Sequence, residues 1–161
     1  LDRFARFYGV PVIDVGLAIE PAPGGGFNDM SARVTVLAPE APCLVCRSVI
    51  APRVAAEEAL ARRFPAEHDR RKREAYVRGG GDPAPAVVTF TTEAATMAVN
   101  ELLQGLTDFR GEGGWAWQRV RRLDRGLERR PGAVPRPHCA LCGTPENWGR
   151  GDVEPFLERV G

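Results

Sequence analysis

The sequence predicts an α/β fold, and three segments of the chain carry this prediction. Residues 10–19 (VPVIDVGLAI) are almost entirely apolar and rich in Val and Ile, which is typical of a strand buried on both faces of a parallel sheet. Residues 32–38 (ARVTVLA) predict a second strand. Residues 86–90 (AVVTF) predict a short buried strand, and the wide apolar stripe of residues 93–106 predicts a helix directly after it. A strand that leads through Thr into a helix is an α/β arrangement.

The other elements of the first half follow from apolar spacing and from the positions of Gly and Pro. Residues 1–8 predict a helix that ends at the glycine following them, because a helix C-terminus favours glycine. Prolines and glycines make residues 20–30 a loop. Residues 53–64 predict a helix, residues 66–76 predict a mostly polar one, and residues 78–85 form a Gly/Pro-rich hinge.

The second half predicts a hairpin and a final helix. Residues 115–123 are expected to form a strand, residues 124–126 a turn and residues 127–129 the returning strand. Asp152 is expected to cap a terminal helix that continues through residue 160.

Length and charge restrict the class of protein. The chain has 161 residues, which suits one domain or a piece of a larger one. Its 22 Lys and Arg residues nearly balance 21 Asp and Glu residues, so a basic field over the whole chain is absent. No apolar run reaches the ~20 residues that cross a bilayer, and no signal-peptide pattern appears at the start. We therefore expect a soluble, cytoplasmic protein that binds neither nucleic acid nor membrane.

Two further features concern the origin of the chain. Lys72 is the only lysine, and the arginine, Gly and Pro content is typical of a GC-rich bacterial genome. The chain begins at Leu1 rather than at methionine, within what resembles the end of a helix. We therefore expect residues 1–161 to be part of something longer.

All four cysteines lie in two Cys-x-x-Cys pairs, Cys43 with Cys46 and Cys139 with Cys142. Two residues between thiols allow one tight turn to present both sulfurs to one metal, and two such turns complete a tetrahedral thiolate site. We therefore expect a structural zinc ion. A catalytic zinc is not expected, because four thiolates leave no open coordination position.

Other interpretations of the cysteines are two disulfides, a redox pair or unrelated thiols. Disulfides fit an intracellular chain poorly, and a redox Cys-x-x-Cys usually begins a helix after a strand. The long separation between the pairs is no objection to zinc. Closing a loop of this length costs about 4 kcal/mol, whereas a structural zinc site contributes about 10–16 kcal/mol.

The order of four segments along the chain is distinctive. They are GVPVIDVG, ARVTVLAPEAPCLVC, PAVVTFTTEAATMAVNELL and HCALCG. In this order they resemble the ThiF/MoeB/ubiquitin-activating-enzyme superfamily, from Leu1 to about Asp152. Members of that family typically show two strands, the second ending in a Pro-rich Cys-x-x-Cys, then a crossover segment, a strand with a small-residue helix, and a final Cys-x-x-Cys.

The resemblance implies a fold, a cofactor and an activity. The fold would be the C-terminal part of a Rossmann-like, ThiF-type sheet, with a zinc clip formed by Cys43, Cys46, Cys139 and Cys142. The activity would be adenylation of the C-terminal glycine of a ubiquitin-like or sulfur-carrier protein, with ATP and magnesium. The implied partners are that carrier protein and the missing N-terminal half, and a homodimer is compatible with the same interpretation.

The chain departs from the family pattern in two ways. The family's glycine-rich phosphate loop, its ATP-contacting basic residues and its magnesium-binding aspartate would precede Leu1. Gly24, Gly25 and Gly26 do not replace that loop, because they open no helix whose dipole would hold phosphate. Residues 47–86 also lack the cysteine that thioester-forming members carry in the crossover segment. We therefore assign no catalytic residue in this chain.

Several other groups were candidates for function. The basic run Arg70–Arg73 is either a clamp for an acidic carrier tail or a solvated helix, and we favour the latter. The arginines of residues 117–130 beside tryptophans are either a single-stranded nucleic-acid surface or the polar side of a hairpin, and we again favour the latter. Asp14 requires a partner if buried, and His138 adjoins the second cysteine pair.

The sequence thus leaves three hypotheses. The first is the C-terminal half of a ThiF-like activating enzyme that supplies the zinc site and a carrier-binding surface. The second is a zinc-stabilised protein-interaction module without catalysis. The third, a zinc-containing nucleic-acid binder, is disfavoured by the balanced charge.

Overall fold

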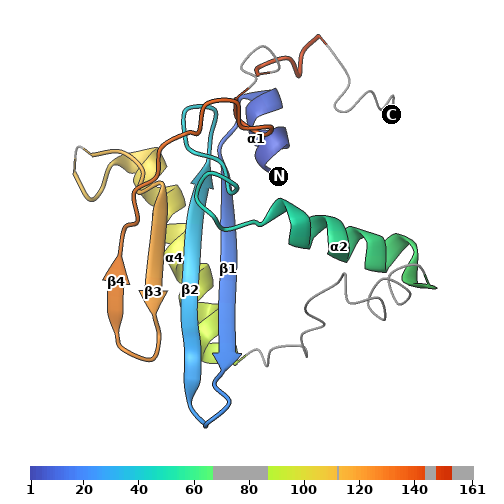
Figure 1. Ribbon diagram of the computed structural model, residues 1–161. Helices are drawn as coiled ribbons and strands as arrows, with labels where there is room; N and C mark the ends of the chain where they lie inside the picture. The colour runs from blue at the N-terminus through green and yellow to red at the C-terminus, as the bar shows by residue number, and fades with distance from the viewer. Residues whose placement is uncertain (67–86, 112, 144–147, 154–161) are drawn as a thin grey trace.

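The computed structural model describes residues 1–66, 87–111, 113–143 and 148–153. Within them, a mixed α/β fold is built on a four-stranded antiparallel sheet. In chain order the elements are α1 (Asp2–Tyr8), β1 (Val12–Pro21), β2 (Phe27–Leu37), α2 (Pro52–Arg63), α4 (Val88–Thr107), β3 (Gln118–Arg122) and β4 (Leu127–Arg129). The sheet order is β1-β2-β3-β4, so each strand lies beside its neighbours in sequence (Figure 1).

The first two strands form a hairpin, so the expected parallel sheet is wrong. β1 pairs antiparallel with β2, and Val12 lies opposite Leu37. Only residues 22–26 connect the two strands, and a connection this short permits an antiparallel pair but not a parallel one. β1 is an edge strand in this sheet, and Val15 is 45% exposed. The apolar run of residues 10–19 therefore does not mark a strand buried on both faces.

The strand expected at residues 86–90 is wrong: residues 88–90 begin α4, Val87 precedes the helix with extended backbone, and Ala86 lies outside the described residues. The helix expected at residues 93–106 is contained in the same element. The Val-rich start favours a strand locally, but α4 buries Ala94 and Met97 against β1 and β2. This packing along one helical face outweighs the local preference of the first turn.

Most other expected elements are confirmed where the structure describes them. α1 ends at Gly9, whose φ of 65° is left-handed, as a helix C-terminus favours. α2 corresponds to the helix expected at residues 53–64, and β3 and β4 form the expected hairpin. Most of the helix expected at residues 66–76, the hinge, and most of the terminal helix lie outside the described residues.

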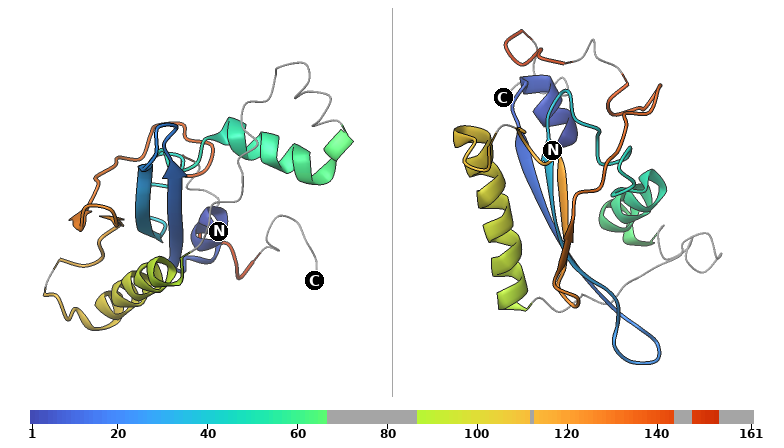
Figure 2. Two further views of the ribbon diagram at one scale, coloured as in Figure 1. Left: turned by 90° about the horizontal axis from the view of Figure 1, so that it is seen from below. Right: turned by 90° about the vertical axis from the view of Figure 1, so that its left-hand side faces the viewer.

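The two longer helices lie on different sides of the sheet. α4 runs along one face, whereas α2 stands off the other side and buries none of its residues (Figure 2). No helix among the described residues is long and apolar enough to span a lipid bilayer.

A buried carboxylate joins α4 to β3. Glu101 of α4 is fully buried, and it accepts hydrogen bonds of 2.8 Å from both Arg110 and Arg119. Arg119 of β3 also holds Glu128 of β4 at 2.7 Å, which lowers the pKa of the Glu128 carboxyl. Because a buried charge requires its partners, the contacts of Glu101 with the two arginines fix the position of α4 along the sheet.

We predict that Glu101→Gln lowers the free energy of unfolding by about 2–3 kcal/mol, because it leaves two arginines facing a neutral amide. Urea denaturation followed by circular dichroism measures the change. Glu57→Gln is the matched control: Glu57 pairs with Arg53 on the surface of α2, where the expected loss is below about 0.5 kcal/mol. Equal losses in the two variants would contradict a special role for Glu101.

Candidate metal centre

The first cysteine pair lies in a loop that follows β2. A tight turn is closed by the N–H of Arg47, which donates to the carbonyl of Cys43 at 3.0 Å. Within the turn, the N–H of Cys46 donates to the sulfur of Cys43 at 3.3 Å. Cys43 is fully buried and Cys46 is 8% exposed. The sequence therefore folds locally so that both sulfurs point to one side of the loop.

The second cysteine pair forms a similar turn close to the C-terminal end of the described chain. The N–H of Gly143 donates to the carbonyl of Cys139 at 2.7 Å. A Cβ atom at Gly143 would lie 2.6 Å from the backbone nitrogen and oxygen of Cys139. Only glycine fits this closure, so the residue after Cys142 is part of the geometry of the turn.

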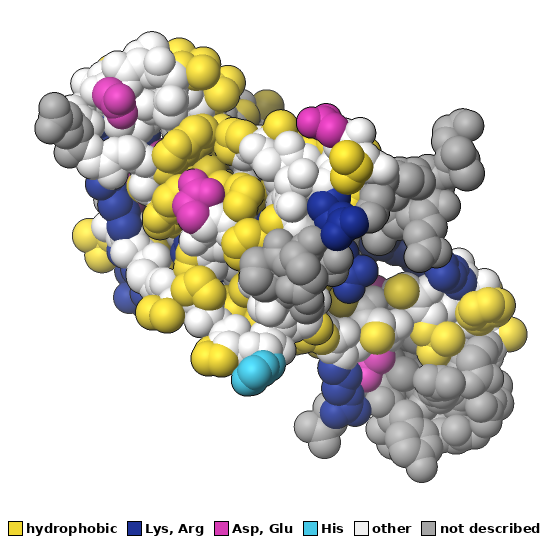
Figure 3. All heavy atoms as spheres, turned by 90° about the horizontal axis from the view of Figure 1, so that it is seen from above, with side chains coloured by type: hydrophobic (Ala, Val, Ile, Leu, Met, Phe, Trp, Pro, Cys, Tyr) yellow, Lys and Arg dark blue, Asp and Glu magenta, His cyan; other side chains and the backbone are white. Residues whose placement is uncertain are grey.

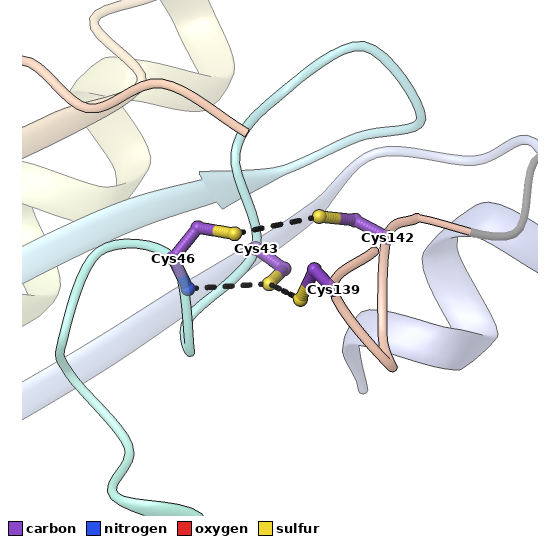
Figure 4. Close-up of side chains that lie close together, drawn as sticks. All are labelled: Cys43, Cys46, Cys139 and Cys142. Carbon is purple, nitrogen blue, oxygen red and sulfur yellow. Dashed lines mark hydrogen bonds between the residues drawn. The ribbon is translucent and has the colours of Figure 1, made fainter. Parts of the chain in front are cut away.

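The fold brings the two turns together. The sulfurs of Cys43 and Cys139 are 3.5 Å apart, and those of Cys46 and Cys142 are also 3.5 Å apart. All four ligand atoms lie within 4.8 Å of one another, and they point toward a common centre (Figure 4). Zinc–sulfur bonds of about 2.3 Å in a tetrahedron place sulfurs about 3.8 Å apart. The four cysteines can therefore hold a metal ion such as zinc.

Burial controls the ionisation of the metal-free thiols. Burial raises the pKa of the Cys43 thiol strongly, and burial also raises that of Cys142. Burial also tends to raise the pKa of the Cys139 thiol. Hydrogen bonds from the backbone N–H groups of Leu141 and Cys142 outweigh this effect and lower the pKa of Cys139 to about 6. One ligand is therefore ready to bind metal at neutral pH, whereas others must first lose a proton.

Helix α1 holds the first cysteine loop in place. Arg6, only 2% exposed, donates to the carbonyls of Pro39 and Ala41, the second at 2.5 Å. Asp2 accepts a hydrogen bond of 2.7 Å from the N–H of Leu44, between the two cysteines. Sequence spacing alone does not reveal the role of these two residues, because an acid and a base four positions apart resemble an ordinary surface pair.

The same helix also contacts the segment after the second cysteine pair. The N–H of Gly149 donates to the carbonyl of Arg6, and that of Gly151 donates to the carbonyl of Phe7. The Arg6 guanidinium lies 5.1 Å from the centre of the Trp148 ring. α1 therefore supports both sides of the thiol cluster. Hydrophobic side chains cover much of the face that carries these loops, and basic side chains flank it (Figure 3).

Other candidate residues lie apart from the thiol cluster. Asp14 has its expected partner: Arg33 of β2 lies 3.5 Å away on the neighbouring strand. His138 is exposed and does not belong to the metal-ligand group found among the described residues. Gly25 and Gly26 have positive φ at the tip of the β1–β2 hairpin, where they open no helix.

The arginines of the β3–β4 hairpin are largely engaged within the protein. Arg121 pairs with Glu93 at 2.9 Å, and Arg122 pairs with Asp124 at the same distance. Together with the pairs of Arg119, these contacts weigh against a free basic surface for nucleic acid. The basic run at residues 70–73 lies outside the described residues. Comparisons with protein-family models and with curated proteins found no match.

We predict that Gly143→Ala reduces the zinc content of the purified protein. The parent should carry about one equivalent, since a closed four-thiolate site retains its metal. The added methyl group collides with the backbone of Cys139 and opens the second turn. Gly132→Ala is the control, because a Cβ there meets nothing within 4 Å. Elemental analysis after gel filtration measures the metal, and full occupancy in Gly143→Ala would contradict the role of this turn.

We also predict that zinc affinity falls steeply with decreasing pH. Because burial raises the pKa values of Cys43 and Cys142, zinc must displace protons from both thiols. Two displaced protons weaken the apparent affinity by about a hundredfold for each pH unit below 8. Competition with a chelator of known pH dependence measures the slope. An affinity that stays constant between pH 8 and 6 would show that the thiols are already ionised without metal.

Proposed function

We propose that this chain is the C-terminal portion of a ThiF-like activating enzyme, and that Cys43, Cys46, Cys139 and Cys142 hold a structural zinc ion. The observation that carries the proposal is the convergence of the two Cys-x-x-Cys pairs into one four-sulfur cluster. The sequence resemblance implies that ligand set, and the remaining segments occur in the order typical of the family. In this proposal the protein acts in the cytoplasm, where thiols stay reduced.

The zinc ion would have a structural role. Four sulfurs complete its tetrahedral shell, so it would have no position for substrate or water. Its ligands come from the loop after β2 and from a segment beyond β4. The zinc ion would therefore cross-link these two segments. The cluster would therefore hold the C-terminal segment against α1 and the sheet.

ATP and magnesium would act in the complete enzyme, with residues that these 161 residues do not supply. The complete enzyme would adenylate the C-terminal glycine of a carrier protein and release pyrophosphate. We further propose that the antiparallel sheet extends a Rossmann-like sheet whose nucleotide-binding strands belong to the remainder of the enzyme. This chain would contribute the zinc clip and a surface for the carrier.

The proposed carrier surface is the sheet face opposite α4. Ile13 and Leu17 of β1 pack toward α4, so the alternating position Asp14 lies on the other face. There it pairs with Arg33, whose guanidinium lies over Gly16; a Cβ on that glycine would be 2.6 Å from the guanidinium. The Arg33 side chain is 30% exposed and therefore open to a partner. A polar, ordered patch of this kind suits a transient protein partner.

We predict that the chain binds a ubiquitin-like or sulfur-carrier protein ending in Gly-Gly, and that it does not exchange pyrophosphate with ATP by itself. Arg33→Gln should weaken carrier binding by about tenfold, which corresponds to about 1.4 kcal/mol. Isothermal titration calorimetry measures the affinity. Arg125→Gln at the β3–β4 turn is the control, because it removes the same charge from an exposed position away from that face.

Two outcomes would oppose this proposal. Robust pyrophosphate exchange by the 161-residue chain would place the ATP site within it. A metal-replete chain that binds no Gly-Gly carrier would favour the alternative, a zinc-stabilised protein-interaction module without catalysis.

A further inference from the structure

Arg47 directly follows the first cysteine pair and folds back on the loop that carries it. Its Nε atom donates a hydrogen bond of 3.0 Å to the carbonyl of Pro42, the residue before Cys43. This bond anchors the guanidinium against the backbone of the first cysteine turn. Arg47 is half-buried, whereas most arginines keep their charged ends in water.

One nitrogen of this guanidinium is a buried donor without an acceptor. The Nη1 atom of Arg47 is shielded from solvent, and nothing in the described part of the chain accepts a hydrogen bond from it. Buried N–H groups nearly always have an acceptor, because a donor without one loses its hydrogen bonds to water and gains nothing in return. The exception therefore requires a local explanation.

The charges that act on Arg47 are negative. Burial lowers the pKa of Arg47, whereas attraction from Asp2, Cys43 and Cys46 acts in the opposite direction. Asp2 is shared with Arg6, whose guanidinium lies 3.5 Å from its carboxylate. Since Asp2 offsets only one of the two arginines, one positive charge remains beside the first two thiols of the cluster.

A four-thiolate cluster that holds a divalent ion carries two net negative charges. Backbone N–H groups offset part of this charge: that of Cys46 donates to the sulfur of Cys43 at 3.3 Å, and that of Arg136 donates to the sulfur of Cys46 at 3.2 Å. Peptide groups carry only partial charges, however, and both cysteines are almost fully buried. A buried net charge of this kind requires a countercharge.

We propose that Arg47 is the countercharge of the metal-loaded cysteine cluster, and that it strengthens zinc binding without being a ligand. Its guanidinium opposes the excess negative charge, and thiolate sulfurs are acceptors for its buried N–H group. Partners outside the ligand shell typically change metal affinity by about 10–100-fold. The inference rests on the proposed zinc site, but it requires neither the carrier protein nor the adenylation activity.

The test compares zinc affinities, measured by competition with a chelator at one fixed neutral pH. Arg47→Gln should bind zinc about 10–100-fold more weakly than the parent. Arg47→Lys keeps the charge, so its affinity should lie closer to that of the parent. Arg130→Gln is the matched control, because it removes the same charge from an exposed position directly after β4, and its affinity should equal that of the parent.

Cobalt substitution separates the charge of Arg47 from its structural contact with Pro42. A positive charge beside the thiolates stabilises their electrons, so its loss in Arg47→Gln should move the sulfur-to-cobalt charge-transfer band to longer wavelength. Loss of the Pro42 contact alone would leave the band of a fully loaded four-sulfur site in place. If Arg47→Gln does not fold, Arg47→Met fills similar space without charge and should show the same weakening and the same shift.

The outcomes distinguish this inference from the proposed function. A folded, neutral Arg47 variant that binds zinc as tightly as the parent would overturn the inference. A weakened variant whose cobalt band stays at the parent position would also overturn it, because the role of Arg47 would then be structural. In both cases the parent still loads zinc, and the proposed zinc site stands. A parent that binds no zinc would instead contradict the zinc site itself.

Discussion

A buried ion pair in the first helix organises the end of the molecule that carries the thiols. The charged groups of Asp2 and Arg6 lie 3.5 Å apart, and both side chains are almost fully buried. Each side chain also has partners other than the opposite charge. Each also holds backbone groups of the loop that presents Cys43, and the backbone of α1 receives the segment after Cys142. Removal of either side chain would leave a buried charge and at least one backbone group of this loop without a partner, which typically costs several kcal/mol. The thiol cluster therefore depends on residues far from it in sequence.

This arrangement helps to bring the two distant cysteine pairs together. The closure of the long loop between the cysteine pairs is assisted by the β2–β3 pairing and by the α1 contacts, so the metal need not supply all of the ordering. Similarly, Glu101 uses arginines of the hairpin to fix α4 on the sheet. Both sites place a charged group in the interior and surround it with several partners.

The sequence was most informative where chemistry and spacing coincide. The paired cysteines predict their own convergence because two Cys-x-x-Cys turns suit one shared metal ion. Gly9 marks the end of α1 because its left-handed backbone favours glycine. The prediction of the sheet failed at residues 10–19 because an apolar run specifies neither burial on both faces nor strand direction, and the short hairpin connection decides direction. The roles of Asp2 and Arg6 could not be predicted, because their partners are backbone atoms that any residue would supply.

The β2–β3 ladder has a kinetic consequence. Two kinds of long-range contact join the same two parts of the chain: Thr35 pairs with Gln118, and the cysteine turns that follow β2 and β4 meet. Once the ladder has formed, the loop that remains to be closed around the thiols is far shorter than the chain between them. Most of the entropy cost of loop closure is then paid when β3 pairs with β2, which is the slow step. The β1–β2 hairpin closes only a short loop, so it can form early and present β2 to β3. Folding of this domain should therefore begin at the hairpin and end with the thiols.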